Sequence, residues 1–246
     1  MSFFKTISCR GKNKGLIVNE DFIHGNKYTF AARLRYNKET ALKVAEQLLQ
    51  IKAIKLSVHK PYTWASGWKS PIYCDNRLSL SYPKVRNYIR RELASAVIDK
   101  FGEPDIIAGV ATGAIAWGAL VAQDLGLPFV YVRSAAKGHG LANMIEGYIE
   151  SGLSVVVVED LISTGMSSLK AVSALRDAGC KVNGMVSIFS YGFDEADKNF
   201  KNEKCKLVTL SDYDSLIKQA VTSEYITESS LKSLAAWRNN PSVWGV

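Results

Sequence analysis

The apolar positions of this chain follow two spacings, one typical of buried strands and one typical of amphipathic helices. The clearest strand signal is Val155–Val158, where four β-branched residues follow one another. Such a segment is too apolar for any place but the centre of a sheet that is covered on both faces. A helix is predicted shortly after it, because Leu169, Val172 and Leu175 share one face at helical spacing. Together these signals predict a strand–turn–helix unit.

The same alternation of strand and helix continues along most of the chain. Further strands are predicted over residues 105–110, 128–132, 181–190 and 207–210, and a short strand over 147–150 is expected to pair with 154–158. Helices are predicted over about 83–100, 115–125, 167–178, 213–220 and 228–237, and one more begins after Asn37 as its cap. Strands that alternate with helices form right-handed crossovers. The expected fold class is therefore α/β, with a doubly wound parallel sheet.

Two segments before residue 83 do not fit this alternation. Residues 56–82 are rich in turns and aromatic residues, which predicts short strands that form a small N-terminal subdomain. Residues 1–36 are basic and lack periodicity, and we expect them to be a disordered or loosely docked extension. The expected organisation is this extension and one domain over 37–246, with its core at 83–212 and C-terminal helices at 213–240.

Charge and composition are those of an ordinary soluble enzyme. The net charge of +8 comes from residues 1–60, which hold 12 Lys/Arg and 4 Asp/Glu; the remainder is neutral, so no nucleic-acid partner is expected. No apolar run approaches the ~18 residues of a membrane helix, so no membrane partner is expected either. Four cysteines without paired spacing indicate a reducing compartment, and the expected location is cytoplasmic.

Candidate chemistry lies directly after the Val155–Val158 strand. Glu159 and Asp160 are adjacent carboxylates at the edge where a parallel sheet opens to solvent and binds ligands. The turn over 163–167, rich in Ser, Thr and Gly, then leads into a helix whose first backbone N–H groups can cradle a phosphate. Carboxylates beside such a cradle suit a sugar phosphate. The alternative is a buried strand followed by a simple Ser/Thr helix cap.

This stretch resembles the phosphoribosyl pyrophosphate signature of the type I phosphoribosyltransferases. The resemblance implies that Glu159 and Asp160 hold the ribose 2′ and 3′ hydroxyls. It also implies that the turn wraps the 5′-phosphate, through Ser163, Thr164, Gly165, Met166 and Ser167. Met166 stands where the family more often has glycine, alanine or threonine. It fits there only if the backbone at 166 does not need a positive φ.

A second motif precedes the core and reads Ser66-Gly67-Trp68-Lys69-Ser70-Pro71-Ile72-Tyr73. Its turns expose backbone groups at fixed spacing beside an aromatic ring, which suits the edge of a pyrimidine. The motif resembles the hood segment of the orotate phosphoribosyltransferases. This resemblance implies that orotate is contacted by Ser70, Ile72, Tyr73 and Ser163. An aromatic-anchored turn without a ligand is the alternative.

Some cations that the family often carries are missing from this chain. Ala65 stands where a lysine is frequent, and residues 190–193 lack the arginine that often contacts the carboxylate of orotate. The Gly109–Ala114 turn resembles the pyrophosphate-binding loop and likewise lacks a frequent lysine. Arg77 and Lys69 are the candidates to supply the charge for the orotate carboxylate.

A third motif, Arg133 to Gly140, puts two cations and an imidazole on a glycine-flanked loop. Such a loop can close over a polyanion and neutralise the charge that develops on it. It resembles the catalytic loop of the same family, which implies that Arg133, Lys137 and His139 stabilise departing pyrophosphate. In the family this loop reaches the neighbouring site, so the resemblance implies a homodimer with the 133–140 loop shared across subunits. A solvated surface loop is the alternative.

Together the motifs predict the activity of the orotate phosphoribosyltransferases over about residues 38–240. The expected reaction converts orotate and phosphoribosyl pyrophosphate to orotidine 5′-monophosphate and pyrophosphate in pyrimidine biosynthesis. Lys137, His139 and Asp160 are the expected catalytic residues. Mg²⁺ is the expected cofactor, carried by the substrate, with no metal ligand assigned to the protein. A purine phosphoribosyltransferase and a non-catalytic regulator that senses phosphoribosyl pyrophosphate stay open as alternatives.

Overall fold

A seven-stranded sheet lies at the centre of the molecule in the computed structural model, which describes residues 33–64, 67–134 and 144–244. The strand order is β1-β11-β10-β9-β6-β7-β8, and neighbours are parallel except β7 and β8. The strands are β1 (Arg33–Arg35), β6 (Ile106–Val110), β7 (Phe129–Val132), β8 (Ile145–Glu146), β9 (Ser154–Ile162), β10 (Lys181–Ser190) and β11 (Leu207–Asp212).

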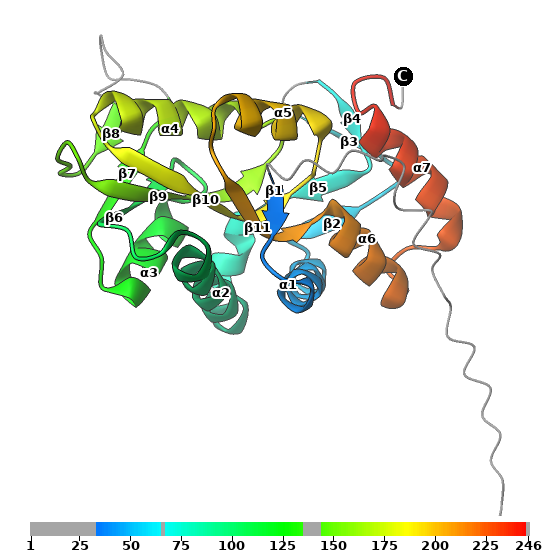
Figure 1. The fold of residues 1–246 in the computed structure, drawn as a ribbon. Helices are drawn as coiled ribbons and strands as arrows, with labels where there is room; N and C mark the ends of the chain where they lie inside the picture. Colours follow the sequence, from blue (N-terminus) through cyan, green and yellow to red (C-terminus); the bar gives the residue numbers. More distant parts are fainter. Residues whose placement is uncertain (1–32, 65–66, 135–143, 245–246) are drawn as a thin grey trace, which may run out of the picture.

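Helices cover both faces of this sheet (Figure 1). One face carries α4 (Met166–Asp177) and α5 (Asp194–Asn202), and the other carries α1 (Lys38–Gln50), α2 (Pro83–Phe101), α3 (Ile115–Leu125) and α6 (Tyr213–Thr222). Successive side chains of a strand point to opposite faces. Val155 and Val157 therefore enter the core beneath α4, while Val156 and Val158 enter the core on the other face, and all four are fully buried. The expected fold class, a doubly wound and mostly parallel α/β sheet, is confirmed.

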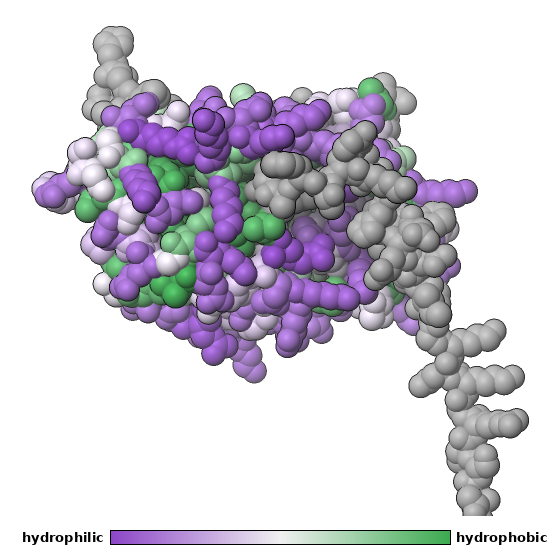
Figure 2. Space-filling model, viewed as in Figure 1, coloured by the Kyte–Doolittle hydropathy of each residue, from purple (hydrophilic) through white to green (hydrophobic). Residues whose placement is uncertain are grey.

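The outer surfaces of the helices are mostly hydrophilic. In the view of Figure 2, apolar side chains show in the band between the two helix layers, where the sheet lies. Among the helices of the described ranges, none has both the length and the apolar character needed to cross a bilayer.

A small subdomain lies beside the sheet, on the side where α7 (Glu228–Asn239) packs (Figure 1). We call residues 54–81 the hood. Its antiparallel pairs, β2 with β5 and β3 with β4, are followed by the 3-10 helix η2. The bounds are β2 (Ile54–Leu56), β3 (Tyr62–Thr63), β4 (Lys69–Ser70), β5 (Ile72–Cys74) and η2 (Asn76–Ser81). Trp64 fastens the hood to the core, because its ring packs against Tyr191 and Trp237.

The N-terminal extension was expected to end at residue 36, but residues 33–35 form strand β1. Residues 33–35 pair in parallel with β11, and the Arg35 guanidinium lies 2.7 Å from the Asp212 carboxylate. These residues therefore form an edge strand of the sheet, although the segment is too short to show an alternation of apolar and polar residues. The rest of the expected extension, residues 1–32, lies outside the described residues.

Two further segments differ from the expectation. Residues 147–150 do not pair with β9, because β6 and β10 already occupy both of its edges; instead β8 pairs with β7. Helix α5 was not expected at all. Its buried residues Ala196 and Phe200 lie on one face at helical spacing, but they are only two in a short and strongly polar segment.

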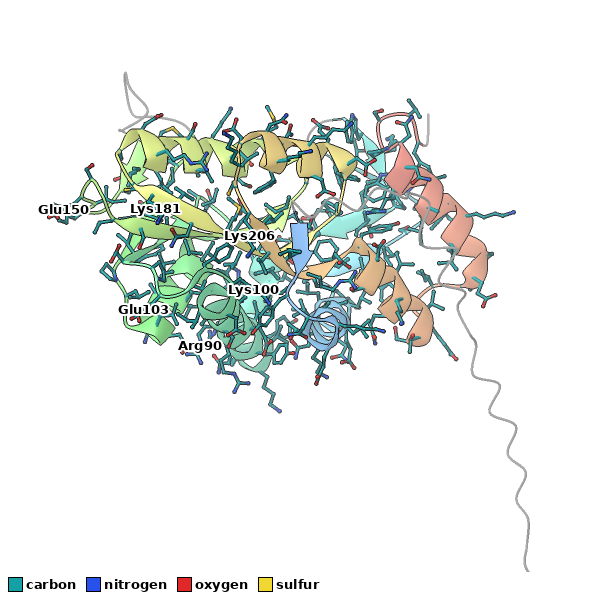
Figure 3. All side chains as sticks on the ribbon, in the orientation of Figure 1. Arg90, Lys100, Glu103, Glu150, Lys181 and Lys206 are labelled. Carbon is teal, nitrogen blue, oxygen red and sulfur yellow. The ribbon has the colours of Figure 1, made fainter. Side chains whose placement is uncertain are left out.

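The two ends of the strands differ in their surroundings. Charged residues gather where strands begin: Glu103 precedes β6, Glu150 precedes β9 and Lys181 opens β10. In Figure 3 these three residues lie on the side of the molecule away from the hood. The hood instead contacts the end of β9, where Asn76 is hydrogen-bonded to Asp160. The candidate site therefore lies at the carboxyl ends of the strands, next to the hood.

Candidate active site at the carboxyl ends of the strands

Strand β9 carries both predicted carboxylates inside its last four residues. It runs to Ile162, beyond the expected end at Val158. Glu159 and Asp160 both belong to the strand, and their carboxyl groups lie close enough to interact directly with each other. Strand β6 pairs with β9 only as far as Val158, whereas β10 continues alongside to Ile162. The end of β9 is therefore open on the β6 side.

Glu159 points towards α4 and is buried, with 5% of its surface exposed. Its Oε1 accepts the backbone N–H of Asp160 at 2.9 Å, and its Oε2 accepts the Ser168 hydroxyl at 2.8 Å. Burial and the neighbouring charge of Asp160 raise the pKa of Glu159 well above its usual range. Both oxygens thus have protein partners, and the expected contact of Glu159 with ribose hydroxyls stays a prediction.

Asp160 is only partly buried. Its carboxylate packs against Gly113 in the Gly109–Ala114 turn so closely that a Cβ at residue 113 would overlap with it. Burial raises the pKa of Asp160, and interactions with Glu159 and Arg77 offset part of that rise. The structure thus brings the predicted pyrophosphate-binding turn into contact with the more accessible carboxylate.

The predicted phosphate turn ends in a left-handed glycine. Gly165 caps α4 with φ of +79°, a conformation that favours glycine. Met166 is the first residue of α4, with helical backbone and a side chain that is 57% exposed, so it meets the condition set for this position. Ser163 and Thr164 are half-buried and Ser167 is exposed. Since the first N–H groups of a helix lack partners within it, this turn presents donors to an anion.

Helix α5 packs against this turn. The Asn199 side chain donates from Nδ2 to the Thr164 carbonyl at 2.9 Å. The Phe200 ring fills the space next to Gly165, where a Cβ would lie 2.6 Å from Cε2 of the ring. Because Phe200 is 1% exposed and belongs to the core, the turn is anchored to the body of the protein.

The three predicted orotate contacts in the hood have different environments. Ser70 is fully buried; its Oγ donates to the Ile72 carbonyl at 2.9 Å and accepts the Ile72 N–H at 3.2 Å. The Ile72 side chain is also fully buried, and its carbonyl accepts the Trp64 indole N–H at 3.0 Å. Tyr73 is 40% exposed. Ser70 and Ile72 therefore shape the turn, and only Tyr73 of the three has an exposed side chain.

Tyr191 lies between the hood and the carboxylates. It is buried, and burial together with the nearby Cys74 and Asp160 raises its pKa well above its usual range. The carbonyls of Tyr191 and Gly192 accept hydrogen bonds from the Arg238 guanidinium at 3.1 and 2.8 Å. The Arg238 guanidinium thus binds the backbone of residues 190–193, the segment that lacks the arginine often found in the family.

The predicted catalytic loop begins at the end of β7. Arg133 follows this strand, and its Nη1 lies 3.4 Å from Oε1 of Glu146 on β8. Its backbone N–H donates to the Met144 carbonyl at 2.8 Å. Lys137 and His139 lie outside the described residues, so their roles stay predictions.

Comparisons with known proteins identify the family of this chain. The family model described as "Phosphoribosyl transferase domain" matches residues 85–223. Relatives named orotate phosphoribosyltransferase include that of Porphyromonas gingivalis, 55% identical over 82% of this chain and 97% of the relative. Another, from Phocaeicola vulgatus, is 58% identical over 81% of this chain and 94% of the relative. The chain belongs to the orotate phosphoribosyltransferase family.

Solved structures place the orotate phosphoribosyltransferase fold on most of the chain. The orotate phosphoribosyltransferase from Aeropyrum pernix superposes with a TM-score of 0.65 at 27% identity, covering 75% of this chain and 99% of that one. The UMP synthase of Leishmania donovani gives a TM-score of 0.68 at 26% identity and covers 82% of this chain and 42% of that one. The expected family resemblance is therefore confirmed.

Several side chains of this orotate phosphoribosyltransferase site were missed by sequence reasoning. Ser168 lies one residue past the predicted turn, so extending the motif by one position would have included it. Asn76 meets Asp160 across 84 positions of sequence, and Asn199 meets Thr164 across 35. No local sequence pattern marks either of these asparagines, because each meets its partner only when the fold brings two distant segments together.

Proposed function

We propose that this protein transfers the 5-phosphoribosyl group of phosphoribosyl pyrophosphate to N1 of orotate, releasing orotidine 5′-monophosphate and pyrophosphate in pyrimidine biosynthesis. One observation carries the proposal: the Asp160 carboxylate packs against the Gly109–Ala114 turn at the strand end that leads into the Ser163–Ser167 cradle. A carboxylate beside a phosphate cradle is what a ribose 5-phosphate group needs. Relatives named for this activity, 51% to 58% identical, support orotate as the acceptor.

The ribose phosphate occupies the end of β9 and the start of α4 in this proposal. The 5′-phosphate accepts hydrogen bonds from the backbone N–H groups and hydroxyls of Ser163, Thr164, Gly165, Met166 and Ser167. Asp160 accepts hydrogen bonds from the ribose 2′ and 3′ hydroxyls, with the buried Glu159 behind it. A carboxylate in this place also favours the positive charge that develops on the sugar as its bond to pyrophosphate lengthens.

Mg²⁺ is the proposed cofactor, and the donor groups of the site fit it as an ion held mainly by the substrate. Across the described residues, no three His, Cys, Asp or Glu side chains come together as a metal cage. Mg²⁺ commonly binds through one or two carboxylates, substrate phosphates and water. Asp160 is the carboxylate that would contribute here. The bound ion supplies charge compensation for the pyrophosphate group.

The acceptor base lies against the Tyr73 ring, and its carboxylate needs a cation. Arg77 is held on the hood by Asp75 through two hydrogen bonds, of 2.7 and 3.0 Å. Its charge interacts with both Tyr73 and Asp160, so it lies near the proposed base contact as well as the carboxylate. Lys69 instead donates to the Thr63 hydroxyl at 2.9 Å, on the β3–β4 pair. Of the two sequence candidates, Arg77 is therefore the one we assign to the orotate carboxylate.

The chemical step exchanges one bond at C1′. The bond from C1′ to the pyrophosphate oxygen breaks and its electron pair leaves with pyrophosphate, while orotate N1 supplies the pair for the new bond on the opposite face. The N1 proton passes to the departing pyrophosphate. Arg133, Lys137 and His139 are the proposed cations around that leaving group. In support, Arg133 lies at the carboxyl end of β7, two strands from β9 in the sheet.

We further propose a homodimer in which the 133–140 loop reaches the site of the partner subunit. Leu78 and Tyr82 support an interface close to the hood, because they are apolar side chains that are 40% and 43% exposed. The cytoplasmic location and the lack of nucleic-acid and membrane partners stay predictions.

Pyrophosphate release with a panel of bases tests the proposed function. Purified protein is mixed with phosphoribosyl pyrophosphate, Mg²⁺ and either orotate, uracil, adenine or hypoxanthine. We expect release with orotate and rates at least about 100-fold lower with the other bases, which cannot satisfy a site built for a carboxylate. Preferred use of a purine would support the purine enzyme instead. Binding of phosphoribosyl pyrophosphate without release for any base would support the non-catalytic regulator.

A further inference from the structure

The backbone of Asp160 lies where β9 has lost one of its two neighbours. Strand β6 stops pairing at Val158, and β10 continues on the other side to Ile162. Peptide groups on the open side have no strand to bond with, and a buried unpaired peptide group is costly. Two side chains replace the missing strand. Glu159 accepts the Asp160 N–H at 2.9 Å, and the Asn76 amide donates to the Asp160 carbonyl at 2.6 Å.

The Asn76 side chain is held in one orientation by the hood. Asn76 opens η2 and is 1% exposed. Its Oδ1 accepts the Cys74 thiol at 3.3 Å, which directs Nδ2 to Asp160. The Ser79 hydroxyl donates to the backbone carbonyl of Asn76 and makes no bond to the side-chain amide. The amide that reaches β9 is therefore oriented before any ligand arrives.

We propose that Asn76 is a positioning residue that aims the Asp160 carboxylate at the ribose and couples the base-binding hood to the ribose-binding strand. This inference rests on the proposed function. The carbonyl and the carboxylate of Asp160 share one Cα, so the bond from Asn76 sets the peptide plane from which the carboxylate projects. Gly113 limits the carboxylate on its other side. Tyr73, three positions before Asn76, then keeps a fixed place relative to the ribose.

Two variants of Asn76 and one matched control test this role. Asn76→Ala removes the amide, and Asn76→Asp keeps its size but replaces the donor with an oxygen. Ser79→Ala removes a buried hydrogen bond from the same helix and leaves the amide in place. For each variant we would measure Tm, kcat, KM for both substrates, and the calorimetric Kd of phosphoribosyl pyrophosphate with Mg²⁺.

We expect both Asn76 variants to lower kcat/KM for phosphoribosyl pyrophosphate about 30-fold, because small misplacements of a catalytic group are costly. We also expect Asn76→Ala to weaken the Kd of phosphoribosyl pyrophosphate about 5-fold, and KM for orotate to change less than about 2-fold. Ser79→Ala should lower Tm by a similar amount but keep kcat/KM within about 3-fold of wild type.

Two results would overturn the inference. One is an Asn76→Ala enzyme within about 3-fold of wild type in kcat/KM for phosphoribosyl pyrophosphate. The other is an equal loss in Ser79→Ala at an equal drop in Tm, which would make the effect purely structural. The Kd separates this inference from the proposed function, because binding of phosphoribosyl pyrophosphate needs no acceptor base. If wild type binds it but does not use orotate, the proposed function fails, and an unchanged Kd in Asn76→Ala then overturns the positioning role as well.

Discussion

Phe200 lies directly against Gly165, with its Cε2 atom 2.6 Å from the point where a side chain at residue 165 would begin. The phosphate turn is thereby pressed onto α5, and Asn199 holds the neighbouring Thr164 carbonyl at 2.9 Å. A turn that is rigid before its ligand arrives binds more tightly, because no ordering cost is added on binding. Helix α5 thus holds in place the turn that we propose binds the 5′-phosphate.

Gly165→Ala is expected to weaken phosphate binding. The alanine would meet both the left-handed φ of +79° and the Phe200 ring, and the turn must move to relieve them. We expect KM for phosphoribosyl pyrophosphate to rise at least about 10-fold, while KM for orotate stays constant. Gly126→Ala is the control, since Gly126 has φ of +68° but open space around it, so only strain of about 1–2 kcal/mol is added. Steady-state kinetics that show the same rise in both variants would contradict the role of Phe200.

Substitutions of Arg77 and Lys69 are expected to differ in their effect on the binding of the acceptor base. We expect Arg77→Gln to raise KM for orotate about 10- to 100-fold, because a charge-assisted contact to the carboxylate is lost. Its KM for phosphoribosyl pyrophosphate should change little. Lys69→Gln, which removes a charge bonded to Thr63, should leave both values near wild type. Initial rates over a range of each substrate decide the assignment, and the opposite ranking of the two variants would transfer the role to Lys69.

The pair Arg35 and Asp212 predicts how stability depends on pH. Burial alone would raise the pKa of Asp212, but the Arg35 guanidinium and the Ser215 N–H outweigh burial and hold this pKa below its usual value. A carboxyl group whose pKa is lowered by folding stabilises the protein above its unfolded pKa of about 4. That contribution is lost as the pH falls through the lower folded pKa.

Arg35→Met should therefore destabilise the protein most at neutral pH. We expect its free energy of unfolding at pH 7 to fall by about 1–2 kcal/mol, less than for a fully buried pair, because the Arg35 side chain is 38% exposed. The deficit should shrink below about pH 4. Lys43→Met, which breaks an exposed pair with Glu46, should cost less than about 0.5 kcal/mol. Urea unfolding at pH 7 and pH 3 measures both; an Arg35→Met deficit independent of pH would refute the assignment.

If the 133–140 loop reaches the site of the partner subunit, mixing two inactive variants should restore part of the activity. Lys137→Ala and Asp160→Asn should each lose at least about 100-fold in kcat. In a mixed dimer, one of the two sites would combine an intact loop from one subunit with an intact Asp160 from the other. After subunits are exchanged at equal concentrations, about a quarter of the wild-type activity should return. Proven exchange without recovery would place Lys137 in the same site as Asp160 of its own subunit.

The sequence alone predicted those elements that carry a strong local pattern of apolar residues. Val155–Val158 is a continuous apolar run, and it forms the centre of the sheet as expected. The elements that were missed contain few apolar residues. Helix α5 buries only two side chains, and β1 is a three-residue edge strand whose place depends on β11 and Asp212. Tertiary contacts therefore decide where these segments lie.

Within the site, the residues contiguous with one motif were predictable, but their directions were not. Glu159 and Asp160 were expected at the end of the strand, and they lie within the last four residues of β9. The sequence could not show that the Glu159 carboxylate accepts the Ser168 hydroxyl. The contact of Asn76 with Asp160 joins the hood to the sheet and needs the whole fold to form.

Formation of orotidine 5′-monophosphate by wild type and by Asp160→Asn tests the central claim most directly. Both proteins are supplied with orotate, phosphoribosyl pyrophosphate and Mg²⁺, and the product is quantified after confirming that their Tm values agree. We expect that wild type forms the nucleotide and that Asp160→Asn forms it at least about 100-fold more slowly. No product from wild type, or a rate for Asp160→Asn within about 3-fold of wild type, would contradict it.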